Sequence, residues 1–321
     1  MPGISLLDAQ QIFTNNGLRT QYGVILPAGS RVAAYVRSTG VQTGDDSFLA
    51  TNLVQTLAAG LARVRPGFGD FVICLPGHKE DVTDATTFSQ ALPPGVKILG
   101  VGRGSNMPTL TWTTPGAQLN LSQNDVLLTG FRLKFAGSSL APVTVAQAVN
   151  ISADDVGFTS NEVELGNAGA NATIGIGITG TAARYEVSGN IFRGQIAAPA
   201  SGSIVVNSTG ADGIIAKNTI IAGAAAATGN IAVLAAAQRL LVDSNQILNI
   251  TPASVAGISY ANLAINGICS DNRIAVAAPG AVVPGVTGIT VGGLSNLTAF
   301  FNNYAVNDPN KSGFLVPAAD T

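Results

Sequence analysis

Residues 211–306 contain one short motif four times: IIAKNTI (214–220), LLVDSNQI (240–247), GICSDNRI (267–274) and AFFNNYA (299–305). Each copy has apolar residues, then a polar pair that ends in Asn, then an apolar residue two places further on. An earlier copy, YEVSGNIF, occupies residues 185–192. The asparagines are separated by 28, 27, 27 and 31 residues, and they are Asn190, Asn218, Asn245, Asn272 and Asn303. Such regular spacing indicates stacked structural repeats.

A second apolar motif repeats in step with the first. It places isoleucines at the same successive steps, and they are Ile176, Ile204, Ile231, Ile258 and Ile289. The apolar runs are four to six residues long, rich in Ile and Val, and bounded by Gly, Asn, Ser and Asp. This pattern is typical of strands and turns, because helical repeats need longer amphipathic segments. The sequence therefore predicts a β-solenoid in which each repeat forms one coil.

The position of each Asn has a physical explanation. A sharp turn between strands often needs a left-handed backbone, which Asn tolerates better than other non-glycine residues, and stacked copies can hydrogen bond as an Asn ladder. Two flanking columns are apolar and should face inward: Phe192, Ile220, Ile247, Ile274 and Ala305, and Val187, Ile215, Val242, Cys269 and Phe300. The column directly after the Asn is mixed and should face outward: Ile191, Thr219, Gln246, Arg273 and Tyr304.

The composition excludes several classes of function. Only 11% of the 321 residues are charged and the net charge is −2, so the chain lacks the basic field that nucleic-acid binding requires. It has no apolar run long enough for a membrane span. The N-terminal sequence MPGISLLDAQQIF lacks the basic start and apolar core of a signal peptide, so we expect a protein that is made in a cytoplasm.

The region before the repeats predicts a strand and a helix. RVAAYVR (31–37) reads as a strand, and SFLATNLVQTLAAGLARV (47–64) reads as one amphipathic helix with leucines at steps of four, capped by Asp45 or Asp46. A helix over 45–65 is suited to cover the open strand edges at the end of a solenoid. The expected organisation is an extended arm (1–30), a strand and capping helix (31–70), a parallel β-helix (71–308) and a C-terminal tail (309–321).

Further motifs follow this helix in a fixed order. They are P-G-x-G-D at 66–70, L-P-G-H-x-E at 75–80, L-P-x-G-V-x-I-x-G-x-G at 92–102 and N-D-V-x-L-x-G-F at 124–131. The order resembles the opening coils of the pectate-lyase-like right-handed parallel β-helix proteins. The resemblance covers residues 31–308 and implies an all-β, right-handed parallel β-helix of about seven or eight coils with an N-terminal capping helix.

Within that superfamily, residues 66–135 resemble a group of bacteriophage virion proteins. The resemblance implies a non-enzymatic structural protein of the phage particle, of the capsid decoration or cement type, made in the host cytoplasm and located on the virion. It also implies a homotrimer that contacts the major capsid protein or another virion protein. We expect the arm 1–30 to make the attachment, because it has too few periodic apolar positions to fold alone.

The alternative function is enzymatic. Within the superfamily that the sequence resembles, enzymes act on polysaccharides through carboxylates on one outer face, so a tailspike-type depolymerase or a polysaccharide lyase remains open. The acidic candidates for catalysis are Asp154, Asp155, Glu162, Glu164 and Glu186. Glu162 and Glu164 should share a strand face, and Arg184 and Arg193 should lie near the acidic residues. The single Trp and the low aromatic content of 6% argue against a sugar-stacking groove.

No motif predicts a cofactor or a metal. The string Gly175, Gly177, Gly180 falls in a predicted strand with no helix after it, so it is not a phosphate-binding loop. His78, the only histidine, is expected to be a turn residue at the edge of a coil, because neither a second His nor paired Cys accompanies it. Cys74 and Cys269 lie in apolar runs and should be free buried thiols.

Overall fold

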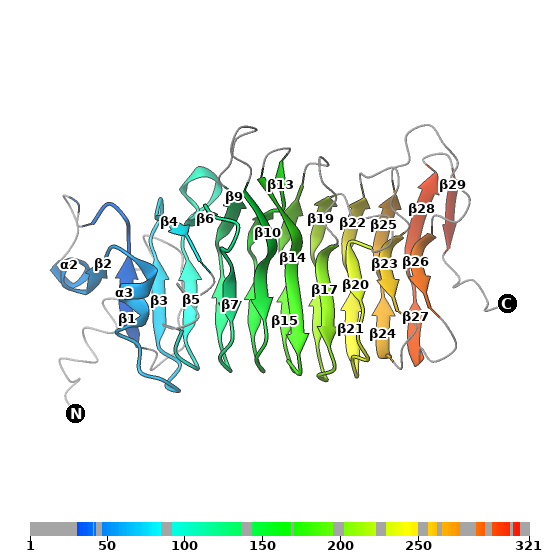
Figure 1. Cartoon of the computed structure of the whole chain (residues 1–321), viewed down its shortest axis with the longest axis horizontal. Helices are drawn as coiled ribbons and strands as arrows, with labels where there is room; N and C mark the ends of the chain where they lie inside the picture. Colours follow the sequence, from blue (N-terminus) through cyan, green and yellow to red (C-terminus); the bar gives the residue numbers. More distant parts are fainter. Residues whose placement is uncertain are drawn as a thin grey trace, which may run out of the picture.

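Each sequence repeat forms one turn of a β-solenoid, and successive turns stack side by side along the long axis of the molecule (Figure 1). The structure is a computed structural model. It describes residues 31–40, 42, 47–84, 92–135, 143–167, 170–194, 202–222, 229–249, 256–261, 265–276, 287–292, 297–308 and 311–314. The arm 1–30, the Asp45 and Asp46 cap and most of the tail 309–321 lie outside these residues.

Three sheets line the rod, and the chain runs from sheet A to sheet B to sheet C in each turn. Sheet A contains β1 (Val32–Val36), β2 (Leu53–Val54), β3 (Phe71–Cys74), β5 (Lys97–Gly100), β8 (Leu127–Thr129), β11 (Gly157–Thr159), β15 (Glu186–Ser188), β18 (Ile214–Ala216), β21 (Leu240–Asp243), β24 (Asn266–Ser270) and β27 (Leu297–Phe301). Sheet B contains β4 (Lys79–Val82), β6 (Thr109–Trp112), β9 (Arg132–Phe135), β12 (Glu162–Glu164), β16 (Ile191–Arg193), β19 (Thr219–Ala222), β22 (Gln246–Asn249), β25 (Arg273–Val276), β28 (Tyr304–Asp308) and β29 (Lys311–Phe314). Sheet C contains β7 (Leu119–Leu121), β10 (Val143–Ile151), β13 (Gly166–Asn167), β14 (Ala170–Gly180), β17 (Gly202–Ser208), β20 (Ile231–Val233), β23 (Ala256–Tyr260) and β26 (Thr287–Val291).

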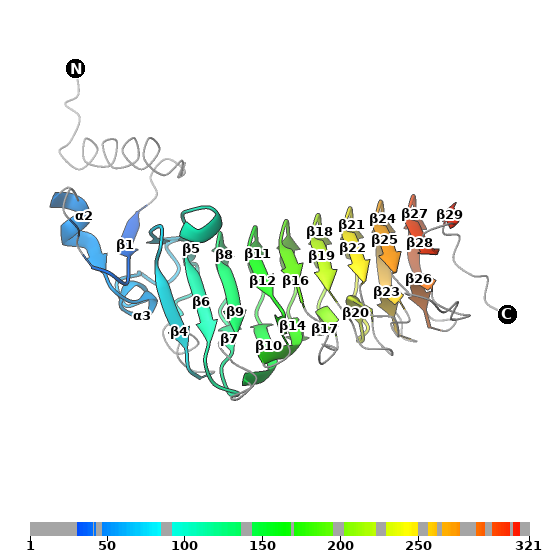
Figure 2. The same ribbon diagram turned by 90° about the horizontal axis from the view of Figure 1, so that it is seen from above.

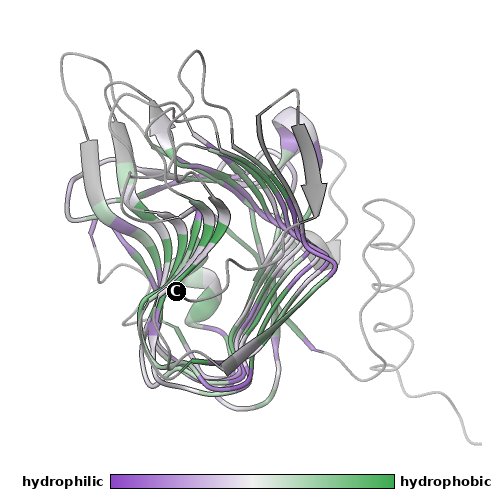
Figure 3. Cartoon of the chain, turned by 90° about the vertical axis from the view of Figure 1, so that its right-hand side faces the viewer, coloured by the Kyte–Doolittle hydropathy of each residue, from purple (hydrophilic) through white to green (hydrophobic). Residues whose placement is uncertain are grey.

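Neighbouring strands pair in parallel, except for the antiparallel pairs β13–β14 and β28–β29. Among the described residues, seven turns have a strand in all three sheets, from β5–β6–β7 to β24–β25–β26. Parallel strands joined by a crossover are almost always connected in the right-handed sense. The predicted all-β, right-handed parallel β-helix is therefore confirmed. Seen along the axis, the turns superimpose on one another (Figure 3).

The interior is built from the predicted apolar columns. Ile176, Ile204, Ile231 and Ile258 are partners in register across sheet C and are fully buried. In sheet B, a buried column contains Val163, Phe192, Ile220, Ile247 and Ile274. In sheet A, a third contains Val187, Ile215, Val242 and Cys269. The register predicted from the Asn spacing is confirmed.

The predicted Asn ladder is present at the corner between sheets A and B, and it is one rung longer than the sequence suggested. Asn161 joins the predicted asparagines, and all six side chains are buried. In each of the first five rungs, the side-chain carboxamide and the backbone N–H donate to Oδ1 of the next Asn, at 2.8–3.3 Å. Each carboxamide N–H also donates to a backbone carbonyl of the previous turn, such as Ile215 for Asn245.

The expectation that the ladder Asn itself is left-handed was wrong. The left-handed residue is the one directly before it, with φ of 54° at Ser160, 64° at Gly189, 56° at Lys217, 53° at Ser244, 54° at Asp271 and 48° at Asn302. This arrangement leaves the Asn side chain free to turn inward, because the residue before it makes the sharp bend. The six residues vary widely in type, which is why the sequence did not mark them.

The predicted single capping helix over 45–65 was also wrong. Two short helices, α2 (Ser47–Asn52) and α3 (Leu57–Leu61), are separated by β2, which pairs with β1 at the end of sheet A. Thr56 is the N-cap residue of α3, and its hydroxyl accepts a hydrogen bond from the Ala59 N–H. The apolar side chains Leu57 and Leu61 are still buried against the first turns, so the segment covers the N-terminal end, at the blue end of the rod in Figure 2. No described helix has the length and hydropathy needed to span a membrane.

Asp70, from the P-G-x-G-D motif, fastens the N-terminal end. Its inaccessible carboxylate accepts from the guanidinium groups of Arg31 at 2.5 Å and Arg65 at 2.7 Å, and from the Arg65 backbone N–H at 2.9 Å. Burial alone would raise the pKa of Asp70, but the Arg65 hydrogen bonds and the Arg31 charge outweigh it and lower the pKa. The carboxylate therefore holds β1 against the turn that precedes β3.

The two cysteines are free and buried, as predicted. Burial raises the pKa of Cys269 to about 12 and raises that of Cys74 well above its usual value. Both thiols therefore stay protonated at neutral pH, which is the behaviour of small apolar core residues.

Candidate functional site

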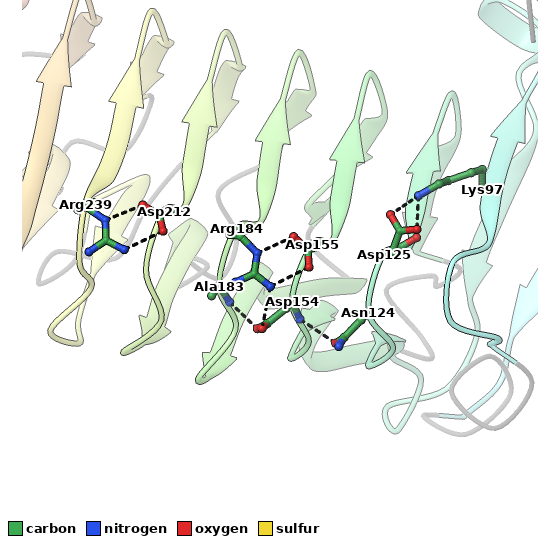
Figure 4. Close-up of polar contacts among 9 residues, drawn as sticks. All are labelled: Lys97, Asn124, Asp125, Asp154, Asp155, Ala183, Arg184, Asp212 and Arg239. Atoms are coloured by element: carbon green, nitrogen blue, oxygen red, sulfur yellow. Dashed lines mark hydrogen bonds and ion pairs between the residues drawn. The ribbon is translucent and has the colours of Figure 1, made fainter. Parts of the chain in front are cut away.

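A column of charged residues follows the corner where sheet C leads into sheet A. Asp125, Asp155, Arg184, Asp212 and Arg239 each stand one or two residues before a sheet A strand, and all have left-handed backbones with φ between 50° and 63°. Stacked turns bring these positions next to one another, as Figure 4 shows. We call these five residues, with Lys97 and Asp154, the charged column.

Opposite charges pair along the charged column. Arg184 donates to both oxygens of Asp155 at 2.7 and 2.8 Å, and also to Asp154 at 3.1 Å. Arg239 binds Asp212 in the same two-pronged geometry, at 2.7 and 2.8 Å. Lys97 binds Asp125 at 2.6 Å. Each pair joins neighbouring turns, so the acidic residues here have a structural role.

Backbone hydrogen bonds continue the same column. The Asp154 carboxylate accepts from the Ala183 N–H at 3.0 Å, and the Asp154 N–H donates to the side chain of Asn124 at 3.2 Å (Figure 4). At the C-terminal end of the charged column, the side chain of Asn266 likewise accepts a backbone hydrogen bond, from the Arg239 N–H at 2.6 Å. Side chains therefore satisfy backbone groups that the left-handed turn exposes.

The electrostatics favour the ionised forms of Asp155, Asp212 and their arginine partners. The hydrogen bond and charge of Arg184 lower the pKa of Asp155, and Arg239 lowers the pKa of Asp212 in the same way. The pKa of Arg184 is raised in return. A general acid needs a raised carboxyl pKa. The lowered pKa values of Asp155 and Asp212 therefore make these two residues unsuited to act as general acids.

The remaining acidic candidates lie on other surfaces. Glu162 and Glu164 do share the outer face of β12, as predicted, but Arg132 on the neighbouring strand binds Glu162 at 2.8 Å and lies 3.9 Å from Glu164. Arg193 is the register partner of Glu164 without forming an ion pair among the described residues. Glu186 lies on sheet A and accepts from the Ser188 hydroxyl at 2.5 Å.

The five acidic candidates are thus divided among three places: the charged column, the outer face of sheet B and the outer face of sheet A. Arg184 lies next to Asp154 and Asp155, as expected, but it forms ion pairs with both of them that join two neighbouring turns. Paired carboxylates that cooperate across a sugar must lie on the same face within reach of one bond. The structure does not gather the five in one site, and Glu162 and Glu164, which share a strand face, lie beside Arg132.

His78 follows the turn at Pro76 and Gly77 and directly precedes β4, as expected of a turn residue, and its side chain is fully buried. Its Nε2 lies 3.0 Å from the Glu80 carboxylate, and the same oxygen accepts from the Leu57 N–H at the start of α3 at 2.7 Å. The Glu80 carboxylate therefore links the L-P-G-H-x-E motif at residues 75–80 to helix α3 of the N-terminal cap. In the described part of the chain, no three His, Cys, Asp or Glu side chains gather as they would around a metal ion.

The glycine string also has a structural role. Gly175, Gly177 and Gly180 belong to β14, where a Cβ at Gly175 would approach the Ser203 carbonyl to 2.5 Å and one at Gly177 would overlap the Gln147 side chain. Close strand packing therefore explains the first two glycines. The described residues 181–185, which directly follow β14, form no helix that could present amide groups to a phosphate.

The sequence did not single out the shallow groove on the outer face of sheet B. The groove crosses the last turns, and part of it is lined by Ser244, Gln246, Asp271, Arg273, Asn302 and Tyr304. An adjoining, more apolar hollow includes Ile221 and Leu248. The signal was present in the mixed outward column after the ladder Asn, since three of its members, Gln246, Arg273 and Tyr304, line both parts.

No protein-family model matches the chain, and no curated protein sequence matches it. Two solved structures are similar in fold. The crystal structure of pectate lyase Pel9A is 11% identical, with a TM-score of 0.32, and the match covers 87% of this chain and 80% of that one. The alginate lyase from Paenibacillus sp. str. FPU-7 is 12% identical, with a TM-score of 0.25, and the match covers 77% of this chain and 96% of that one. Neither similarity bears on activity.

Proposed function

We propose that this protein is a non-enzymatic structural protein of a bacteriophage particle, a capsid decoration or cement protein that is attached through residues 1–30. The observation that carries the proposal is the pairing of acidic residues between neighbouring turns. Arg184 holds Asp154 and Asp155, and Arg239 holds Asp212. Carboxylates that brace a rod from turn to turn contribute to a rigid scaffold.

The rod also has the mechanical character that such a protein needs. Three continuous sheets join the turns, and the buried ladder from Asn161 to Asn303 adds further bonds between the later ones. Strands about 4.8 Å apart leave little freedom for adaptation. Attachment must then be made by segments outside the regular turns or by side chains on the flat faces. The link to a phage particle comes from the resemblance of residues 66–135 to virion proteins.

Deletion of residues 1–30 tests the mode of attachment. The chain 31–321 should keep the circular dichroism spectrum and melting temperature of the full chain, because the turns supply their own core. It should lose binding to empty capsids in a co-sedimentation assay. Full capsid occupancy by the shortened chain would place attachment on the sheet faces or the tail. Mass spectrometry of purified particles gives the copy number: hundreds of copies fit decoration of the capsid, and a few fit the tail.

A polysaccharide lyase or depolymerase is the second candidate, and the groove on sheet B favours it. The groove combines an acid, a base and an aromatic ring, namely Asp271, Arg273 and Tyr304, which are the residue types that bind and cleave acidic sugars. Incubation of the full chain with acidic polysaccharides tests it, because lyase cleavage creates a conjugated double bond that absorbs ultraviolet light. Release of such products by the wild type, and their loss in Arg273→Ala, would replace the structural proposal.

A further inference from the structure

The turn at residues 66–69, which leads into β3, departs from the regular corner between sheets C and A. In the later turns, a left-handed residue stands two residues before one register row of sheet A, and these residues are Gly95, Asp125, Asp155, Arg184, Asp212 and Arg239. In the turn before β3, the left-handed Gly67 stands four residues before the same row, at Phe71. Phe68 and Gly69 are therefore a two-residue insertion into this corner. Insertions into one repeat of a solenoid are often binding elements.

Backbone hydrogen bonds identify Gly67 as the equivalent of the later left-handed residues. The Gly67 N–H donates to the Pro94 carbonyl at 2.8 Å, and the Gly95 N–H donates to the Asn124 carbonyl in the same way at 2.9 Å. The two turns also pack closely, because a Cβ at Gly95 would lie 3.2 Å from the Gly67 Cα. The base of the insertion is therefore fixed on the body of the rod.

Phe68 is the most exposed large apolar side chain in the described part of the chain, at 71%. It lies between two left-handed glycines, Gly67 with φ of 78° and Gly69 with φ of 68°. The Arg65 guanidinium stacks over its ring, 4.8 Å from the centroid. The buried Asp70 carboxylate in turn holds this guanidinium, with contacts at 2.7 and 3.2 Å. The ring is therefore exposed but restrained, so a partner that buries it would pay little to order it.

The surface around Phe68 is basic. The side chains of Arg31 and Arg65 are 40% and 50% exposed, and Arg63 is exposed as well. Arg31 lies beside Arg63, because its guanidinium donates to the Arg63 carbonyl at 3.3 Å. The carboxylate that Arg31 and Arg65 share, Asp70, is inaccessible. Three positive charges and one negative charge leave this surface net positive, on a chain whose net charge is −2.

This combination favours an acidic protein segment as the partner. Aromatic side chains and arginines are the residue types enriched at protein interfaces, where a ring fills a pocket and complementary charges select the partner. A nucleic acid would need a larger basic field, because its affinity comes from many phosphate contacts. An acidic segment with an apolar pocket matches both the charge of the surface and the ring of Phe68.

The same surface lies where the arm 1–30 joins the rod. The described rod begins at Arg31, whose carbonyl accepts from the Phe71 N–H at 2.8 Å and whose guanidinium contacts Asp70. Phe68 is three residues before Phe71 in the chain. A protein that receives the arm is therefore within reach of Phe68.

We propose that Phe68, Arg31, Arg63 and Arg65, which we call the basic patch, dock onto an acidic segment of the protein that receives residues 1–30. The Phe68 ring enters an apolar pocket of that partner. The inference rests on the proposed function and deepens it, because it gives the chemistry of the partner and adds a second point of attachment. Two linked contacts bind more tightly than either alone, since the first raises the effective concentration of the second.

Co-sedimentation of the full chain with empty capsids, at a series of protein concentrations, tests the basic patch. Phe68→Ala and Arg63→Glu should each weaken binding about tenfold or more. Both should keep the melting temperature of the wild type, because both side chains are exposed. The matched controls are Leu234→Ala and Arg273→Glu, which change an exposed apolar and an exposed basic side chain elsewhere on the rod and should bind like the wild type. Added salt should weaken wild-type binding, and Arg63→Glu should reduce this dependence.

The possible failures are distinguishable. Wild-type affinity in both Phe68→Ala and Arg63→Glu would overturn this inference and leave the proposed function in place. Equal weakening by the two controls would also overturn it, because the loss would not be specific to the basic patch. Double-stranded DNA probes the other class of partner: DNA binding by the wild type that Phe68→Ala loses would assign the basic patch to nucleic acid instead. Absence of capsid binding by the wild type would overturn the proposed function, and this inference with it.

Discussion

The corner between sheets A and B and the corner between sheets C and A solve the same backbone problem with different chemistry. Five of the described turns, those that contain Asp125, Asp155, Arg184, Asp212 and Arg239, place one left-handed residue at each of the two corners. At the first corner the next residue is a buried Asn, and six such side chains form a continuous ladder. At the second corner the left-handed residues are themselves charged and exposed, and they pair across turns as the charged column.

The difference shows where stability comes from. A buried carboxamide that loses its partners leaves unsatisfied polar groups in a low-dielectric interior, at a cost of about 1–3 kcal/mol for each group. An exposed ion pair loses much of its attraction to water and salt. The ladder should therefore dominate the stability of the rod, and the charged column should adjust it. Four substitutions test this ranking, from the largest expected effect to the smallest.

Ile247→Asp should destabilise the rod most, because it places an unpaired carboxylate in the column beside the ladder. Ile247 is 3% exposed and stacks between Ile220 and Ile274. The expected loss is roughly 5 kcal/mol in the free energy of unfolding, seen as a large fall in melting temperature. Gln246→Asp, one residue away on the outer face, is the control and should melt like the wild type. A normal melt for Ile247→Asp would refute the register.

Asn245→Ala removes the centre of the ladder. It leaves the Asn218 N–H and carboxamide without their ladder acceptor. It also removes the side-chain donor to the Ile215 carbonyl and one of the two donors to the Asn272 Oδ1, which keeps the backbone N–H of residue 245. The expected loss is about 3 kcal/mol, measured by chemical denaturation. Ser244→Gly is the control, because it changes the left-handed residue of the same corner and keeps every ladder bond. Equal effects of both substitutions would mean that the bend, and not the ladder, limits stability.

Asp70→Asn examines an intermediate case, a buried carboxylate with exposed arginine partners. The expected loss is about 2 kcal/mol at neutral pH. Because the pKa of Asp70 is lower in the folded than in the unfolded chain, this stabilisation is present above the unfolded pKa of about 3.9 and is lost as the pH falls through the folded value. Melting temperatures of wild type and variant should therefore converge in acid. A constant difference across that range would assign the effect to packing.

Arg184→Gln should have the smallest effect, close to the error of a melting experiment. The pair with Asp155 is exposed, and the lowered pKa of Asp155 makes its contribution present above the unfolded pKa and lost as the pH falls through the folded one. Any difference from the wild type should also shrink in high salt. Lys134→Gln, a substitution outside the charged column, is the control. A loss as large as that of Asn245→Ala would show that the two corners contribute equally.

The sequence predicted the ladder better than its surroundings. Asn190 to Asn303 were recognised from their spacing, but Asn161 was not. Asn161 is the first rung, because the preceding rung position holds Phe131, which offers its backbone N–H to the Asn161 Oδ1 but has no carboxamide to extend the ladder. The capping helix was predicted as one element because its leucines follow a helical period. Leu53 in fact joins β2, since pairing with β1 gives its backbone hydrogen-bond partners at the end of sheet A.

The candidate site was less accessible to sequence reasoning. Asp154, Asp155 and Arg184 were named together, yet only the stacking of turns 29 or 30 residues apart turns them into a structural pair. Glu162 and Glu164 were placed on one face by the alternation of a strand, but their partner Arg132 comes from the turn before. A charged residue in a turn looks the same in sequence whether it binds a substrate or a neighbouring turn.

The sequence by itself determined the period, the β class and the inward columns, because these depend on spacing and polarity that each turn repeats. The tertiary structure decided which residue of each corner is left-handed, which charges are neutralised and which apolar side chains remain exposed. These properties depend on contacts between turns far apart in the chain. A period records that the turns are alike, whereas only their stacking shows what each side chain meets on the next turn.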